Sequence, residues 1–158
     1  MSAVIGIDMG GSHIKCGRFD SATGALLESA SLPTRDGEWS GDRPAWAITI
    51  EELLRKWCPD KDLRIGISAP GLAAADGRSI AFMPGRLEGL EHFDWTQKLG
   101  WPTSIPVIND AHAALLGEIW RGAAKGSDNV AMLTLGTGVG GAAFVDGRLL
   151  KGHIGRAG

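Results

Sequence analysis

The sequence has little of what marks a secreted, metal-binding or membrane protein. It has only two cysteines, Cys16 and Cys58, whose spacing matches no metal or redox motif, so we expect two buried thiols in a reducing cytoplasm. No apolar run approaches the ~20 residues of a membrane span, and no basic-then-apolar leader opens the chain. The four histidines show no metal spacing, and a net charge of −2 gives no general attraction to nucleic acid or membranes. These absences predict a cytoplasmic protein with neither kind of partner.

Glycine, by contrast, is abundant. The 158 residues include 24 glycines, which is about twice the usual share of roughly 7%. They cluster in turns beside apolar runs and form no low-complexity repeat, which favours sites built from backbone groups over disorder. The 44% apolar content can build a real core, and the length fits one domain, or one domain with part of another.

The first glycine cluster lies between two apolar runs near the N-terminus, and this pattern predicts a β-hairpin. Gly10 and Gly11 leave only backbone N–H groups at its tip, where an anionic group can approach closely, and Ser12 adds a hydroxyl. Asp8, at the end of the first strand, could hold a hydrated Mg²⁺ against such an anion. An ordinary hairpin with Asp8 as a turn residue explains the same pattern equally well.

The next segments alternate in a way that is typical of a parallel crossover. Residues 25–32 are predicted to form a third strand, followed by a loop at residues 34–41. Asp42 is expected to cap a helix that ends near Pro59, because apolar residues recur there at helical spacing. A strand at residues 63–68 then completes a β-α-β unit.

A short helix at residues 93–100, capped by Asp94, precedes a strand that delivers Asn109 and Asp110 to its end. The sites of open α/β sheets gather at such strand ends, and a carboxylate there can accept a proton from a hydroxyl group. The alternative for both residues is N-capping of the following helix, which is expected to end at Gly126. Both roles can hold at once.

The second glycine cluster follows a predicted strand at residues 130–135. The run from Gly136 to Gly141 formally satisfies the dinucleotide pattern G-x-G-x-x-G, but a strand and not a helix is predicted after it, which argues against that function. Thr137 with Gly136 and Gly138 would hold one phosphate, and the first tip another. Phosphoryl transfer needs chiefly positioning and charge neutralisation, so one base and Mg²⁺ complete a sufficient set.

Five motifs, in order along the chain, resemble the ROK family of sugar kinases within the actin/hexokinase/Hsp70 ATPase superfamily. They are Asp8-Met-Gly-Gly-Ser12 with Lys15, Gly66-Ile-Ser-Ala-Pro-Gly71, Asn109-Asp110 with the helix after it, Leu135-Gly-Thr-Gly-Val-Gly-Gly141, and Gly152-His-Ile-Gly155-Arg-Ala-Gly158. The resemblance implies an α/β fold: a ribonuclease H-like, actin-type ATPase lobe whose mixed sheet has a three-stranded meander followed by β-α-β. That lobe would occupy residues 1–125, and the first hairpin of a second, similar lobe residues 126–158.

The resemblance also implies roles for single residues. Asp110 would be the catalytic base that takes the proton of the sugar hydroxyl, while Asn109 and Gly71 would hold other sugar hydroxyls. The donor would be ATP with Mg²⁺ at Asp8, bound by the two glycine tips through Asp8, Gly10, Gly11, Ser12, Lys15, Gly136, Thr137 and Gly138. The partners would be a hexose and ATP, and the resemblance allows a homodimer.

Three departures from the family pattern bear on these expectations. Residues 86–90 read Arg-Leu-Glu-Gly-Leu where the family usually has Asn-Leu-Pro-Gly-Trp on the sugar side, and His112 replaces a common Asn. The family continues past the equivalent of Gly158 with a sugar-binding Glu and His, a zinc motif and the adenine-binding region. We therefore expect an N-terminal fragment with little kinase activity alone, whose strands within residues 130–151 expose an apolar face.

The favoured function is ATP-dependent phosphorylation of a hexose, as by a glucokinase. An acetamido-sugar kinase, acting on N-acetylglucosamine or N-acetylmannosamine, stays open, as does polyphosphate as the donor. A third alternative is a sugar-sensing ROK regulator without its DNA-binding domain. Such regulators carry a helix-turn-helix before the first phosphate motif, and here that motif already begins at Ile5.

Overall fold

The computed structural model describes residues 3–135 and 139–152. The main sheet contains β1 (Ala3–Met9), β2 (His13–Asp20), β3 (Leu26–Pro33), β6 (Arg64–Ala69) and β9 (Val107–Asn109). A second sheet contains β10 (Val130–Leu135), β11 (Val139–Val145) and β12 (Arg148–Leu149). The helices are α1 (Ala45–Trp57), α2 (Trp95–Leu99) and α3 (Asp110–Arg121). Two short hairpins complete the elements: β4 (Trp39–Ser40) with β5 (Arg43–Pro44), and β7 (Leu72–Ala73) with β8 (Ile80–Phe82).

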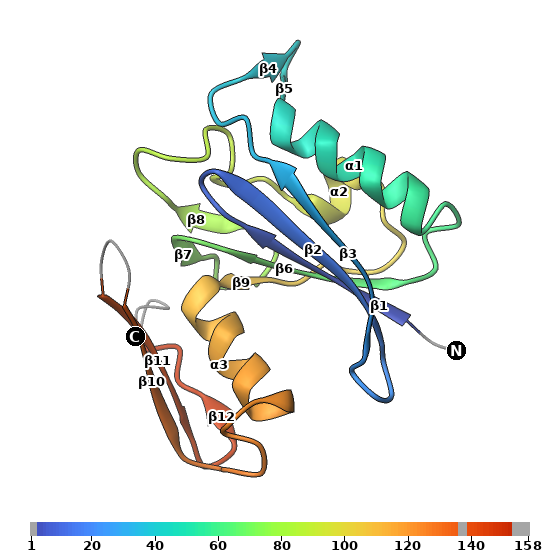
Figure 1. Ribbon diagram of the computed structural model, residues 1–158. Coiled ribbons are helices and arrows are strands. Elements are labelled where there is room, and N and C mark those ends of the chain that lie inside the picture. The colour runs from blue at the N-terminus through green and yellow to red at the C-terminus, as the bar shows by residue number, and fades with distance from the viewer. Residues whose placement is uncertain (1–2, 136–138, 153–158) are drawn as a thin grey trace.

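The main sheet has the strand order β3-β2-β1-β6-β9 (Figure 1). β1, β2 and β3 pair antiparallel as a meander, whereas β6 is parallel to both β1 and β9. The crossover from β3 to β6 contains α1, which covers one face of the sheet (Figure 1). The predicted mixed sheet, a meander followed by β-α-β, is confirmed.

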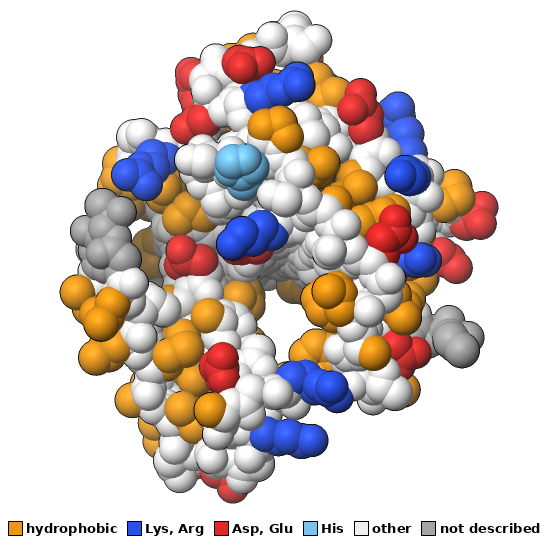
Figure 2. Space-filling model, in the orientation of Figure 1, with side chains coloured by type: hydrophobic (Ala, Val, Ile, Leu, Met, Phe, Trp, Pro, Cys, Tyr) orange, Lys and Arg blue, Asp and Glu red, His pale blue; other side chains and the backbone are white. Residues whose placement is uncertain are grey.

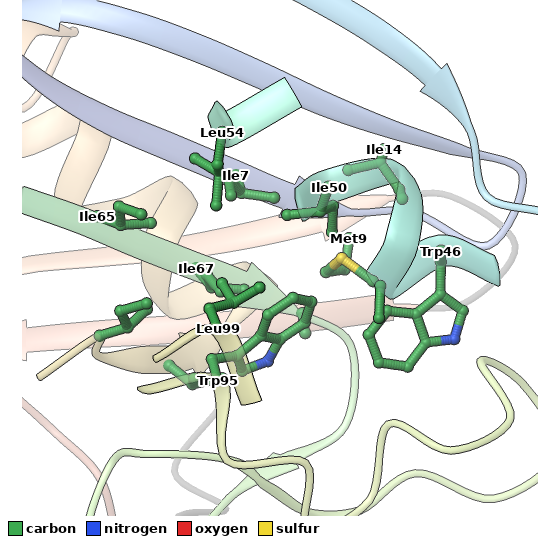
Figure 3. Packing of buried hydrophobic residues seen from close by; sticks show 14 of the residues in the cluster. Ile7, Met9, Ile14, Trp46, Ile50, Leu54, Ile65, Ile67, Trp95 and Leu99 are labelled. Atoms are coloured by element: carbon green, nitrogen blue, oxygen red, sulfur yellow. The ribbon is translucent and has the colours of Figure 1, made fainter. Parts of the chain in front are cut away.

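The main hydrophobic core fills the space between this sheet and α1 and α2 (Figure 3). Alternate residues of β1, such as Ile7 and Met9, point toward α1, whose Trp46, Ile50 and Leu54 recur every four residues and are at most 2% exposed. Each such side chain contributes about 1.5–3 kcal/mol when fully buried. Both tryptophans of this helix, Trp46 and Trp57, belong to the core.

The second sheet packs on α3 through a smaller cluster of its own (Figure 1). Ala111 and Leu115 of α3 are buried against Ala142 of β11, with Ile119 and Phe144 at the margin. Because α3 begins where β9 ends, the same helix that carries Asp110 connects the two sheets. No helix in the described part of the chain combines the length and hydrophobicity needed to cross a bilayer.

The other face of the second sheet is exposed and apolar. Leu133, Leu135 and Val139 are 74%, 82% and 75% exposed, and hydrophobic side chains gather along this edge of the molecule (Figure 2). The predicted uncovered apolar face is confirmed. Exposed apolar surface of this kind marks a place where protein packs.

The start of α1 differs from the prediction. Its N-cap is Pro44, which offers no side-chain acceptor, and Asp42 lies instead in the two-residue turn between β4 and β5. The expected loop at residues 34–41 therefore contains part of a hairpin. Strands of two residues carry too little alternation to be recognised in a sequence, and the same holds for β7.

The end of α3 also differs, because the helix stops at Arg121 and not near Gly126. The N–H of Ala123 donates to the carboxylate of Glu118 (2.8 Å) instead of continuing the helical ladder. The helix thus ends five residues before Gly126, and the Glu118 carboxylate accepts the N–H of a residue that follows it. At α2 the prediction holds, since Asp94 accepts a hydrogen bond from the N–H of Gln97 (3.1 Å).

Candidate active site

A cleft of about 630 Å³ lies where β1, β6 and α3 meet, with a further wall from β10. Its lining includes Asp8, Gly10 and Gly11 from the first hairpin and Asp110 from the start of α3, together with Thr134 from β10. The structure therefore brings together one predicted phosphate tip and the predicted base, which are about 100 residues apart in the sequence. These residues share the cleft because parallel β1, β6 and β9 end at the same edge of the sheet.

The first tip presents its N–H groups in a defined way. The N–H of Gly10 donates to the carbonyl of His13 (3.1 Å) and closes the turn; a Cβ at Gly10 would lie 2.4 Å from that oxygen. The N–H groups of Gly11 and Ser12 donate to no residue in the described part of the chain. No neighbouring atom lies within 4 Å of a Cβ built on Gly11. Gly11 and Ser12 are thus the tip donors available to an anion.

Thr34 supports this tip from behind, and sequence reasoning missed it. Its side chain is fully buried; the hydroxyl donates to the carbonyl of Gly10 (2.6 Å), and its N–H donates to the carbonyl of Ser12 (3.0 Å). The carbonyl groups of Gly10 and Ser12 are therefore turned toward Thr34. The one signal in the sequence is a hydroxyl residue directly after Pro33 at the end of β3, which is too common to single out.

Asp8, the predicted Mg²⁺ ligand, faces the cleft at the end of β1. One carboxylate oxygen accepts a hydrogen bond from the hydroxyl of Ser68 (2.7 Å), and the side chain is exposed to the cleft. No group of three or more His, Cys, Asp or Glu side chains gathers for a metal within residues 3–135 and 139–152. A single carboxylate suits Mg²⁺, which keeps several of its waters and is completed by substrate phosphates.

Asn109 connects α3 to the loop that follows β6. Its side-chain oxygen accepts hydrogen bonds from the N–H groups of Ala111 (2.9 Å) and His112 (3.3 Å), so the predicted N-capping is confirmed. Its amide nitrogen donates to the carbonyl of Gly71 (3.0 Å) and retains a second hydrogen for a ligand oxygen. Binding of a sugar hydroxyl by Asn109 and Gly71 stays a prediction.

Gly71 is required by geometry. Its φ is +99°, and a Cβ there would lie 2.6 Å from the carbonyl oxygen of Phe82 and 2.9 Å from the Cβ of Met83. A side chain at this position would force both Phe82 and Met83 to move. Asp110 follows the N-cap, in the first turn of α3, and its exposed carboxylate stands in the cleft at the positive end of the helix dipole.

Lys15 is not brought into the cleft. It lies opposite Asp8 in the β1–β2 register but forms no ion pair with it, and it lines a second hollow of about 500 Å³. The lining of that hollow includes Gly6, Gly17 and Gly66, which are aligned across three strands on the face away from α1. With mostly apolar walls and few convergent polar groups, the hollow is a weaker candidate for a catalytic site than the cleft.

The second predicted tip, Gly136, Thr137 and Gly138, lies outside the described residues. Its flanks are described: β10 ends at Leu135 and β11 begins at Val139, so a strand follows the glycines. The prediction that this run is no dinucleotide fingerprint is confirmed, since that fingerprint requires a helix at this point.

Comparison with known proteins settles the family. A model described as "ROK family" matches residues 4–158. The chain belongs to the ROK family. It is 34% identical to a glucokinase of Halalkalibacterium halodurans over 98% of this chain and 47% of that protein. It is 34% identical to a β-glucoside kinase of Klebsiella pneumoniae over 98% of this chain and 50% of that protein.

A solved structure agrees with this ROK assignment. The crystal structure of a ROK family glucokinase from Streptomyces griseus, in complex with glucose and AMPPNP, superposes with a TM-score of 0.76 at 30% identity. That match covers 99% of this chain and 48% of the glucokinase, and it confirms the predicted fold class. This ROK chain spans about half the length of the curated relatives that it matches.

Proposed function

We propose that this ROK chain forms the hexose- and phosphate-binding lobe of an ATP-dependent sugar kinase of the glucokinase type. The observation that carries the proposal is the shared cleft, in which the Asp110 carboxylate and the open tip at Gly11 line one cavity of about 630 Å³. A base and a phosphate-binding turn on one cavity wall are what an in-line transfer to a hydroxyl needs.

In the proposed reaction, the N–H groups of Gly11 and Ser12 hold phosphate oxygens of ATP. Mg²⁺ held by Asp8 would neutralise charge on those phosphates. Asp110 takes the proton of the acceptor hydroxyl while the oxygen of that hydroxyl bonds to the γ-phosphorus of ATP. The bond between the γ-phosphorus and the oxygen that bridges it to the β-phosphate breaks, and ADP leaves. Asn109 orients the acceptor through its remaining amide hydrogen.

Two acceptors are supported by the relatives. A glucokinase and a β-glucoside kinase are equally similar to this chain, at 34% identity each. We therefore propose glucose as the first acceptor and a β-glucoside as the second. ATP is the proposed donor because the Streptomyces griseus glucokinase was crystallised with AMPPNP.

A chimera tests the proposal. Residues 1–158 are fused to the remaining half of the Halalkalibacterium halodurans glucokinase, and ADP release is followed with glucose and with cellobiose. We expect turnover from the chimera and none from the isolated 158 residues. Asp110→Asn should lower kcat about 10²–10⁴-fold, the usual contribution of a general base. Asp128→Asn, in the exposed segment before β10, is the matched control.

Two results would contradict the proposal. Near-parent activity of the Asp110→Asn chimera would remove the assigned base. A folded chimera that binds ATP but phosphorylates neither sugar would remove the acceptor class. Circular dichroism and a thermal melt of each variant separate these results from simple misfolding.

A further inference from the structure

The segment at residues 85–89, called here the 85–89 loop, is held in an unusual conformation. Leu87 has φ +52° although it is not glycine, and it is only 1% exposed. Both oxygens of the Asp36 carboxylate accept backbone hydrogen bonds from the loop, from Leu87 and from Glu88, at 2.8 Å each. The indole of Trp46 donates to the carbonyl of Glu88 (3.1 Å). Strained backbone persists where its surroundings over-determine it, which is frequent at functional sites.

This fixed backbone presents Arg86 to the cleft. Arg86 lines the same cavity as Asp8 and Asp110, and it makes no hydrogen bond or ion pair with any residue in the part of the chain that the structure describes. Two carboxylates beside its loop bind backbone N–H groups instead. Asp36 binds the two loop N–H groups, and Glu91 accepts the N–H of Met83 (2.6 Å). The guanidinium of Arg86 thus shares the cleft with the carboxylates of Asp8 and Asp110 but is paired with neither.

The position of Arg86 is on the acceptor side. Its loop follows Met83, which lies directly beside Gly71. The carbonyl of Gly71 in turn accepts a hydrogen bond from the side-chain amide of Asn109. The donor side is defined by the tip at Gly11. A guanidinium offers a planar fork of N–H donors that matches the oxygens of a carboxylate or a phosphate group.

We propose that Arg86 determines acceptor specificity by binding a carboxylate substituent of the sugar. This inference rests on the proposed function, because it assumes that a sugar occupies the Asn109 side of the cleft. It narrows the glucose-type acceptor proposed above to one class: a hexose with an acidic group, which binds more tightly than the neutral hexose. Asp36 is the positioning residue that fixes the loop.

The test is a titration of the ¹⁵N-labelled chain, observed at the Nε–Hε resonance of Arg86, which is assigned by its loss in Arg86→Lys. The probes are glucuronate, glucose, inorganic triphosphate with Mg²⁺, and acetate at matched ionic strength. We expect a saturable shift with glucuronate and a Kd about tenfold below that for glucose, equivalent to about 1.4 kcal/mol. Arg86→Gln lacks that resonance and is followed through the backbone amides of the 85–89 loop, where the difference should be abolished. Arg64→Gln, at an exposed position on β6, should keep it.

Each other outcome overturns the inference. A response to triphosphate without one to glucuronate assigns Arg86 to the donor. Equal responses to glucose and glucuronate, or a shift that acetate reproduces, remove the specificity. No response at Arg86 also contradicts it. If the amides of Gly11 and Ser12 respond to triphosphate with Mg²⁺ while Arg86 is silent, the proposed function stands and only this inference fails.

Discussion

Replacement of Asp36 by Ala tests whether one carboxylate holds the 85–89 loop. The variant loses two hydrogen bonds of 2.8 Å, to the N–H groups of Leu87 and Glu88. A hydrogen bond to a charged group contributes about 1.5–3 kcal/mol, and because Asp36 is itself exposed the lower end applies. We therefore expect the free energy of unfolding to fall by about 2–3 kcal/mol, a large share of the 5–15 kcal/mol of a typical domain.

Urea unfolding, followed by tryptophan fluorescence and by circular dichroism, measures this loss. Asp36→Asn keeps one acceptor oxygen and should lose about half as much. Asp42→Ala removes an exposed carboxylate without a hydrogen-bond partner in the described chain and should change stability by less than about 0.5 kcal/mol. If Asp36→Ala were as stable as Asp42→Ala, the carboxylate would not be what fixes the loop.

Three further predictions concern other parts of the chain. Gly71→Ala should lower the free energy of unfolding by about 2–4 kcal/mol, because φ is +99° and its Cβ would meet backbone; an unchanged urea midpoint would refute this. Leu133→Lys with Leu135→Lys should reduce dye binding and any self-association while changing stability by less than about 1 kcal/mol; undiminished dye binding would count against an exposed face. Burial raises the pKa of Cys16 to about 12, so iodoacetamide should label it slowly at pH 9 unless the chain is unfolded. Since the unfolded thiol ionises near 9.0 and the folded one near 12, stability should also fall as pH rises between these values, and rapid native labelling would contradict the assignment.

Much of the architecture could be predicted because it depends on local periodicity. The alternation through Ile5 and Ile7 predicts β1, and the four-residue spacing of Trp46, Ile50 and Leu54 predicts α1. The strand-end rule then places Asp110 near the first glycine tip without knowledge of any contact. These signals are present within a dozen residues of sequence.

The supporting contacts could not be predicted because they join distant residues. Thr34 reaches Gly10 across 24 positions, and Asp36 reaches Leu87 across 51. Neither pair has a motif, since threonine and aspartate are ordinary loop residues until the sheet and α1 bring their partners close. The prediction of Asp42 as a helix cap is wrong for a local reason. Its residue type fits a cap, but the short β4–β5 hairpin that contains it leaves no periodic signal in the sequence.

The central claim is that the first glycine tip binds phosphate beside Asp110. Titration of the ¹⁵N-labelled chain with ATP and Mg²⁺ tests it most directly. We predict saturable shifts of the Gly11 and Ser12 amides that depend on Mg²⁺, and loss of that dependence in Asp8→Asn. Saturable shifts confined to the apolar hollow around Gly17, or none at the tip at any ATP concentration, would contradict the claim.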